Sequence, residues 1–269
     1  MEQSPHKASS VDFDGNIIHS STPVFLLKPT PQWWKEIEVD QKPFDQLVEA
    51  GKIDGKDYRY VNDNFQDSAR LFREPGNMFQ EFMSALVNNL LWPSAPQMKE
   101  ATLYADPFSI NTARGASSEE MRAIHKVFIY EALTHDERKT MLHHIQRKFC
   151  PGMTNETRLI EKYLLSNHHY GCSHPEFDQA FGTSSYDSIS FKKRISFRDA
   201  TTHASYLFSL QDVWFTKDPR FSHGFSDDNK KNILGMQEYI QKELIHLFPS
   251  TTFFTYDTSD HSHIQETKF

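Results

Sequence analysis

Two capping boxes between residues 117 and 150 constrain the fold of this chain more than any other feature. SSEE, from Ser117 to Glu120, and THDE, from Thr134 to Glu137, each place a hydroxyl three positions before a glutamate. That spacing opens a helix, because the two side chains pair with backbone N–H groups that the first turn leaves unsatisfied. An apolar stripe at helical spacing follows each box: Met121, Ile124, Phe128 and Ala132, then Met141, Leu142, Ile145 and Phe149. Two consecutive helices are therefore predicted.

Similar signals extend the helical region in both directions. Asn77 is a plausible N-cap for a helix that Trp92-Pro93 ends, and residues 157–165 carry a further apolar stripe after the break PGMTN. These signals predict an antiparallel helical subdomain over residues 67–166. Another long helix is predicted between Asp228 and Pro249.

The second half of the chain has the composition of strands. Residues 186–210 are rich in β-branched and aromatic residues, with apolar alternation in SISF and RISF, and VWF resumes the pattern. TTFFTY, from Thr251 to Tyr256, predicts a final strand. The expected fold class is therefore α+β, with the central helical subdomain packed on a C-terminal antiparallel β-sheet.

The expected domain organisation is simple. Residues 1–14 are expected to form a disordered polar tail and residues 15–269 a single α+β domain, in which residues 167–257 form the β-core. A chain of 269 residues can bury such a core without cross-links, and two cysteines are too few for a disulfide framework.

Charge and hydropathy exclude several classes of partner. The formal net charge is −7 and no long basic block occurs, which argues against nucleic acid as the main partner. No apolar run approaches the roughly 20 residues of a membrane span, and the first residues lack the order of a secretory signal. A cytoplasmic protein is expected, or one exported without a classical signal, for example into a host cell. Glycine-rich nucleotide motifs are absent, so no cofactor is expected.

One stretch combines residues that could do chemistry. THASYLFSLQDVWFTKDP, from Thr202 to Pro219, places His203 at the start of an alternating run and Asp218 fifteen residues later. If the run forms a β-hairpin, His203 and Asp218 lie opposite or diagonal to each other on one face in either loop register. The aspartate could then fix the tautomer of the imidazole and leave its other nitrogen as a base.

A nucleophile for that base lies upstream. Cys172 stands in NHHYGCSHPEFDQAFG, where Gly171 allows a tight turn and Pro175 suits the first turn of a short helix. A thiol near a helix N-terminus and an imidazolium is favoured as thiolate, the reactive form. Cys172, His203 and Asp218 are therefore the candidate catalytic residues, and no metal ligand is assigned.

Together these residues resemble a known family. A cysteine after a glycine at a helix start, a histidine that opens a strand, and an aspartate in a W-x-x-x-D-P context resemble the transglutaminase-like branch of the papain-like cysteine enzymes. The resemblance covers about 50 residues. It implies a thiol-dependent hydrolase or acyltransferase that acts on glutamine amides or peptide bonds of a protein substrate, such as a deamidase, a transglutaminase or a protease. Several deamidases of this kind are bacterial effectors and virulence factors that modify host proteins.

Three other interpretations stay open. The stretch His168 to His174 offers four soft ligands for zinc, which His223, His261 or His263 could complete. If the protein were a mono-ADP-ribosyltransferase that uses NAD, three further side chains could serve as its arginine, serine and glutamate: Arg114, Ser196 and either Glu238 or Glu243. In a pure binding module, the cysteine and histidine would be structural residues of the core.

Overall fold

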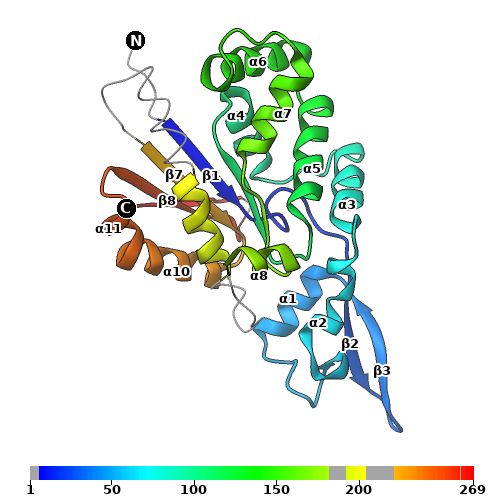
Figure 1. Ribbon diagram of the computed structural model, residues 1–269. Coiled ribbons are helices and arrows are strands. Elements are labelled where there is room, and N and C mark those ends of the chain that lie inside the picture. The colour runs from blue at the N-terminus through cyan, green and yellow to red at the C-terminus, as the bar shows by residue number, and fades with distance from the viewer. Residues whose placement is uncertain (1–5, 182–191, 204–220, 261) are drawn as a thin grey trace.

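A six-stranded sheet forms the centre of the structure, a computed structural model that describes residues 6–181, 192–203, 221–260 and 262–269 (Figure 1). The strand order is β6-β5-β1-β7-β8-β9. The strands span His6–Val11 (β1), Phe108–Thr112 (β5), Tyr170–Gly171 (β6), Phe221–Asp227 (β7), Thr251–Asp257 (β8) and Gln265–Lys268 (β9).

The sheet is parallel except for its last strand. β1 pairs in parallel with β5 on one side and with β7 on the other, and only the edge strand β9 is antiparallel among the described strands of this sheet. From β1 the chain builds outward to β5 and β6, then returns to the other side of β1 for β7 and β8. This reversal makes β1 a topological switch point of an open α/β sheet.

The position of β1 overturns the expectation of a disordered tail for residues 6–14, while residues 1–5 lie outside the described residues. Residues 6–11 form the central strand, and Ser10 and Val11 are fully buried. The sequence HKASSV lacks the apolar run that is typical of a strand buried on both faces. Its polar groups are instead paired across the fold, as in the hydrogen bond of 3.1 Å between Ser10 Oγ and His223 Nε2.

A layer of helices covers one face of the sheet. Both predicted helix starts are confirmed, but only the second capping box is complete, because the Glu120 side chain accepts hydrogen bonds from the Gly76 and Phe79 amides. Ser117 accepts a hydrogen bond from the Glu120 amide, and Thr134 and Glu137 form the complete reciprocal box. The helices of this region share one core with Val11 and Ile110 of the strands, so they form a layer of the domain. They span Asn77–Val87 (α3), Ala95–Tyr104 (α4), Ser118–Glu131 (α5), His135–Phe149 (α6) and Glu156–Ser166 (α7).

The opposite face carries a second core. A helix over residues 192–203 and helix α10 (Lys230–Tyr239) pack Phe197 and Met236 against Phe225 and Phe253 of the strands. α10 continues through a π-helical turn at Ile240–Leu244 into α11 (Ile245–Leu247) and ends before Pro249, as predicted.

The prediction of strands over residues 186–210 is therefore wrong for residues 192–203. The four-residue alternation in RISF could not separate a strand from a helix. The buried residues of this segment recur at helical spacing: Lys192, Lys193, Ser196, Phe197, Ala200 and Thr201. The mixed α/β content is confirmed. The C-terminal antiparallel sheet is replaced by a parallel sheet with helices on both faces.

A small module lies beyond the carboxyl ends of the large sheet (Figure 1). It has its own sheet of order β3-β2-β4 and its own core, which includes Val24, Leu26 and Phe44. Its elements are β2 (Val24–Pro29), β3 (Trp34–Val39), α1 (Gln41–Glu49), β4 (Arg59–Tyr60), a turn at Val61–Asp63, α2 (Phe65–Ser68) and a turn at Arg70–Arg73. Among the described helices, none is both long and apolar enough to cross a membrane.

Buried histidines make the stability of this fold sensitive to acid. Burial lowers the pKa of His223 to about 3, and its ring is hydrogen-bonded to Ser10 and Thr201. The unfolded chain takes up the proton near pH 6.5, so the neutral folded form loses stability as the pH falls from there toward 3.

We predict that the stability difference between wild type and His223→Gln shrinks by about 1.4 kcal/mol per pH unit between about pH 6 and 4. Urea unfolding at several pH values measures it. A difference that does not depend on pH would contradict a neutral buried imidazole at this position.

Candidate active site

Two acidic pairs follow neighbouring strands of the sheet. Asp12 and Asp14 come directly after β1, while Asp227 ends β7 and Asp228 follows it. β1 and β7 are paired in parallel with Val11 opposite Ser226, so the next residues, Asp12 and Asp227, lie side by side. In open α/β sheets, the crevice at the carboxyl ends of strands at the switch point is where ligands bind.

Three of these carboxylates converge. Side-chain oxygens of Asp12, Asp227 and Asp228 lie within 4.8 Å of one another. Gly15 permits this approach, because a Cβ atom at this position would overlap the carboxylate of Asp228. Its φ of 68° also favours glycine. The sequence DFDGN therefore supplies both the carboxylates and the space that the cluster needs.

A buried lysine binds two members of the cluster. Lys193, on the helix over residues 192–203, places Nζ 2.8 Å from Asp227 Oδ2 and 3.1 Å from Asp12 Oδ1. All three side chains are less than one tenth exposed. Burial alone would lower the pKa of Lys193, but the charges of Asp12 and Asp227 outweigh it and hold the lysine protonated.

One lysine does not balance the negative charge. Burial, with repulsion from Asp227, Asp228 and Asp14, raises the pKa of Asp12 well above its usual range despite the attraction of Lys193. The pKa of Asp228 is raised to about 7, again mainly by burial and by the charge of Asp227. A divalent cation would remove this repulsion, and clustered carboxylate oxygens are ligands that Mg²⁺ prefers.

The carboxylates of the cluster differ in the number of hydrogen bonds that they accept. Asp227 accepts hydrogen bonds from the Asn229 amide, from the Asn232 side chain and from Lys193. Asp12 Oδ1, in contrast, has no hydrogen-bond partner within the described part of the chain, since Lys193 approaches it as a charge without hydrogen-bond geometry. A buried carboxylate oxygen that accepts no hydrogen bond within the described residues fits a bound cation or a reacting group.

The neighbouring strand β5 contributes further polar groups at the same edge. Thr112, its last residue, accepts a hydrogen bond from the Arg114 amide, and its hydroxyl can still donate. The Arg114 guanidinium forms a two-pronged ion pair with Asp14. The charge of Asp14 in turn acts on Asp12 and on Asp45 of helix α1, so the small module contributes a carboxylate to the surroundings of the site.

The sequence-predicted catalytic residues are placed differently. Cys172 is fully buried after β6, where its thiol contacts Ser196 Oγ at 3.6 Å, and burial raises its pKa to about 11. His203 is the last described residue of the helix over residues 192–203, stacks on His168 and is hydrogen-bonded to the Ser166 carbonyl. His203 therefore lies on a helix, whereas the predicted hairpin required it to lie on a strand. Asp218 lies outside the described residues, so the triad and its thiol-dependent chemistry stay a prediction.

Several residues of the zinc-site and ADP-ribosyltransferase interpretations form hydrogen bonds or ion pairs with other residues of the fold. His169 Nδ1 accepts from the Ile110 amide, and across the described ranges the stretch from His168 to His174 forms no group of three converging ligands. Ser196 donates to the Lys192 carbonyl, and Glu238 forms an exposed ion pair with Lys242. Arg114 lies among acidic partners, which does not favour a role in binding NAD phosphates.

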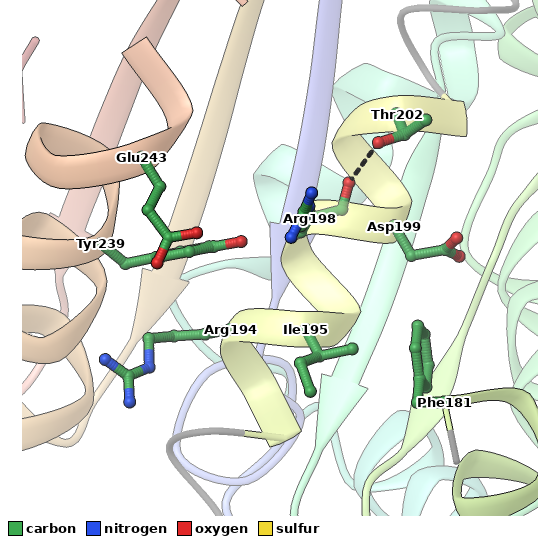
Figure 2. A pocket seen from close by; sticks show the side chains of 8 residues that line it. All are labelled: Phe181, Arg194, Ile195, Arg198, Asp199, Thr202, Tyr239 and Glu243. Carbon is green, nitrogen blue, oxygen red and sulfur yellow. Dashed lines mark hydrogen bonds between the residues drawn. The ribbon is translucent and has the colours of Figure 1, made fainter. Parts of the chain in front are cut away.

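A separate pocket lies on the outer side of the helix over residues 192–203 (Figure 2). It has a volume of about 490 Å³, and residues of this helix and of the α10 region line much of it, including Arg194, Arg198 and Tyr239. Lys193 is not among the lining residues. This pocket is therefore distinct from the carboxylate cluster.

Comparison with known proteins found no family model, curated protein or solved structure that matches the chain. The assignment of the site therefore depends on its geometry.

The sequence interpretation missed the acidic cluster and Lys193. The signal was present in VDFDGN and FSDDN, two short segments in which aspartates and an asparagine follow a strand. This signal does not identify the site from the sequence alone, because HKASSV lacks the apolar run of a buried strand and the pairing of β1 with β7 joins residues more than 200 positions apart.

Thiol reactivity tests the placement of Cys172. At neutral pH, we expect alkylation of the folded protein to modify Cys150, which is partly exposed, and to leave Cys172 unmodified until the protein unfolds. Mass spectrometry of peptides from the two sites measures the order. Fast labelling of Cys172 at mildly acidic pH, reduced by His203→Ala, would contradict this placement and support the thiol-enzyme interpretation.

Proposed function

We propose that the protein is a phosphoryl-transfer enzyme that requires a divalent cation and hydrolyses phosphate monoesters, with Asp12 as the nucleophile. The observation that carries the proposal is a buried Asp12 oxygen that accepts no hydrogen bond within the described residues, is ion-paired with Lys193 and belongs to a cluster in which carboxylate oxygens of Asp12, Asp227 and Asp228 lie within 4.8 Å of one another. This group lies at the switch point of an α/β sheet, the usual place for a ligand.

The surroundings support Asp12 over its neighbours as the attacking group. Asp227 accepts hydrogen bonds from Lys193, Asn229 and Asn232, which fix its orientation and suit a ligand more than a nucleophile. Asp12 is the residue that extends the central strand into the crevice. Aspartate carboxylates act as nucleophiles toward phosphoryl groups in enzymes that form an aspartyl phosphate.

Positive charge is the other requirement of phosphoryl transfer. Lys193 supplies one fixed charge, and Thr112 and backbone amides at the strand ends can donate hydrogen bonds to phosphoryl oxygens. A Mg²⁺ ion held by Asp12, Asp227 and Asp228 would neutralise the charge of the phosphoryl group and orient it for attack. Without such compensation, a phosphate dianion would be repelled by the carboxylates.

The proposed reaction has two balanced steps. In the first, an Asp12 oxygen forms a bond to phosphorus while the ester P–O bond breaks, and the leaving oxygen takes a proton from Asp14. In the second, water attacks phosphorus, gives a proton to Asp14, and displaces the Asp12 carboxylate to release inorganic phosphate. Asp14 suits this role because it lies two residues from Asp12 on the same loop and is held in place by Arg114.

The proposal is tested by hydrolysis of a small aryl phosphate and a panel of biological phosphate monoesters. We expect activity that EDTA abolishes and Mg²⁺ restores. Asp12→Asn should lower kcat/KM by more than about 10³-fold, because it removes the nucleophile. Lys193→Met should lower it by about 10²-fold, because it removes one fixed charge from the transition state.

Lys192→Met is the matched control for Lys193→Met. Lys192 is equally buried but pairs with Asp178 on α8 (Pro175–Phe181), away from the acidic cluster. We expect Lys192→Met to reduce thermal stability and to keep Mg²⁺-dependent activity within about tenfold of wild type. Activity that is independent of Mg²⁺, or that survives in Asp12→Asn, would contradict the proposal.

A further inference from the structure

Arg114 is a buried charged side chain outside the acidic cluster that donates hydrogen bonds to four different side chains. Its side chain is 1% exposed, yet its guanidinium reaches Asp14 at the edge of the site. Nε donates to both carboxylate oxygens of Asp14, at 3.1 and 2.9 Å, and Nη2 donates to Oδ1 at 2.5 Å. This fork-shaped contact fixes the plane of the carboxylate as well as its position.

The other side of the same guanidinium is anchored to α3. Glu81 accepts a hydrogen bond from Nη2, and Asn77 Oδ1 accepts one from Nη1 at 2.8 Å. The Ser20 hydroxyl also accepts from Nη2 at 2.8 Å. Arg114 is thus held between two carboxylates, and its own orientation is determined by groups that do not belong to the site.

These α3 side chains also hold the segment that joins the site loop to the small module. Glu81 accepts hydrogen bonds from the Ser21 amide at 2.8 Å and from the hydroxyls of Ser20 and Ser21. Asn77 Oδ1 accepts a further bond from the Thr22 hydroxyl at 3.2 Å. The linking segment, residues 19–23, is therefore attached to the same network as Asp14.

A buried ion network of this kind is a poor device for stability alone, because its desolvation offsets most of the attraction between its charges. Such a network does hold each of its side chains in a single orientation. The ionised form of Asp14, which is its form between proton transfers, repels Asp12 and is attracted by Arg114. Without Arg114, Asp14 would lose its only ion pair recorded in the described part of the chain.

We propose that Arg114 is the positioning residue of the site: through its fork-shaped contact it holds Asp14 where the proton is transferred, and through Glu81 and Asn77 it holds the linking segment of the small module. This inference rests on the proposed phosphoryl-transfer function. It predicts that catalysis depends on the shape of the Arg114 side chain as well as on its charge.

The test compares Arg114→Lys with wild type in two measurements. Lysine keeps the charge and loses the fork, so we expect kcat for aryl phosphate hydrolysis to fall by about 10²-fold, with a much smaller change in KM. Hydrogen–deuterium exchange should increase in peptides that cover residues 14–22 and stay unchanged in α6. In Arg114→Ala, added guanidinium should restore part of the lost kcat.

Arg138→Lys is the matched control, because Arg138 is a partly buried arginine on α6 that donates to the Tyr130 carbonyl far from the site. It should change neither kcat nor exchange in residues 14–22. If Arg114→Lys does not fold, Glu81→Gln replaces it, with a smaller loss of kcat and faster exchange in residues 19–23.

The two measurements separate the two proposals. If wild type shows no Mg²⁺-dependent phosphatase activity, the proposed function fails, and the exchange measurement still decides whether Arg114 fixes the loop. If wild type is active and Arg114→Lys keeps wild-type kcat, or leaves exchange in residues 14–22 unchanged, the positioning role is overturned.

Discussion

The ion pairs of Lys193 with Asp12 and Asp227 are the interaction on which the rest of the structure depends. They join three segments of the chain: the ends of the adjacent strands β1 and β7, and the helix that covers one face of the sheet. Each charge is buried, so each would carry a large desolvation penalty without the others. The central strand, the helical layer and the acidic crevice are therefore parts of one arrangement.

This arrangement explains why the site lies where it does. Parallel pairing brings the carboxyl ends of β5, β1 and β7 to one edge, and the strand order reverses at β1, which is where open α/β sheets bind ligands. The small module is inserted directly after the β1 loop and lies beyond the same edge (Figure 1). A substrate that reaches Asp12 would therefore meet the module that the linking segment holds.

The sequence alone predicts those parts of the fold that are determined locally. The helices after Ser117 and Thr134 could be predicted because a capping box and an apolar stripe lie within a few residues of each other. The parallel sheet could not, because β1 and β5 have buried polar residues whose partners are distant in the chain, such as Ser10 with His223. The candidate site was missed for the same reason.

The measurement that tests the central claim most directly is the mass of the phosphorylated protein. An aryl phosphate releases a phenolate that needs little help from a proton donor, so Asp14→Asn should slow the second step more than the first. Acid quenching of this variant during turnover of an aryl phosphate with Mg²⁺ should therefore trap the phosphoryl group. The account predicts the added mass of one phosphoryl group on the peptide that contains Asp12. A phosphoryl group on another residue, or turnover by wild type with no modification of Asp12 in either protein, would contradict it.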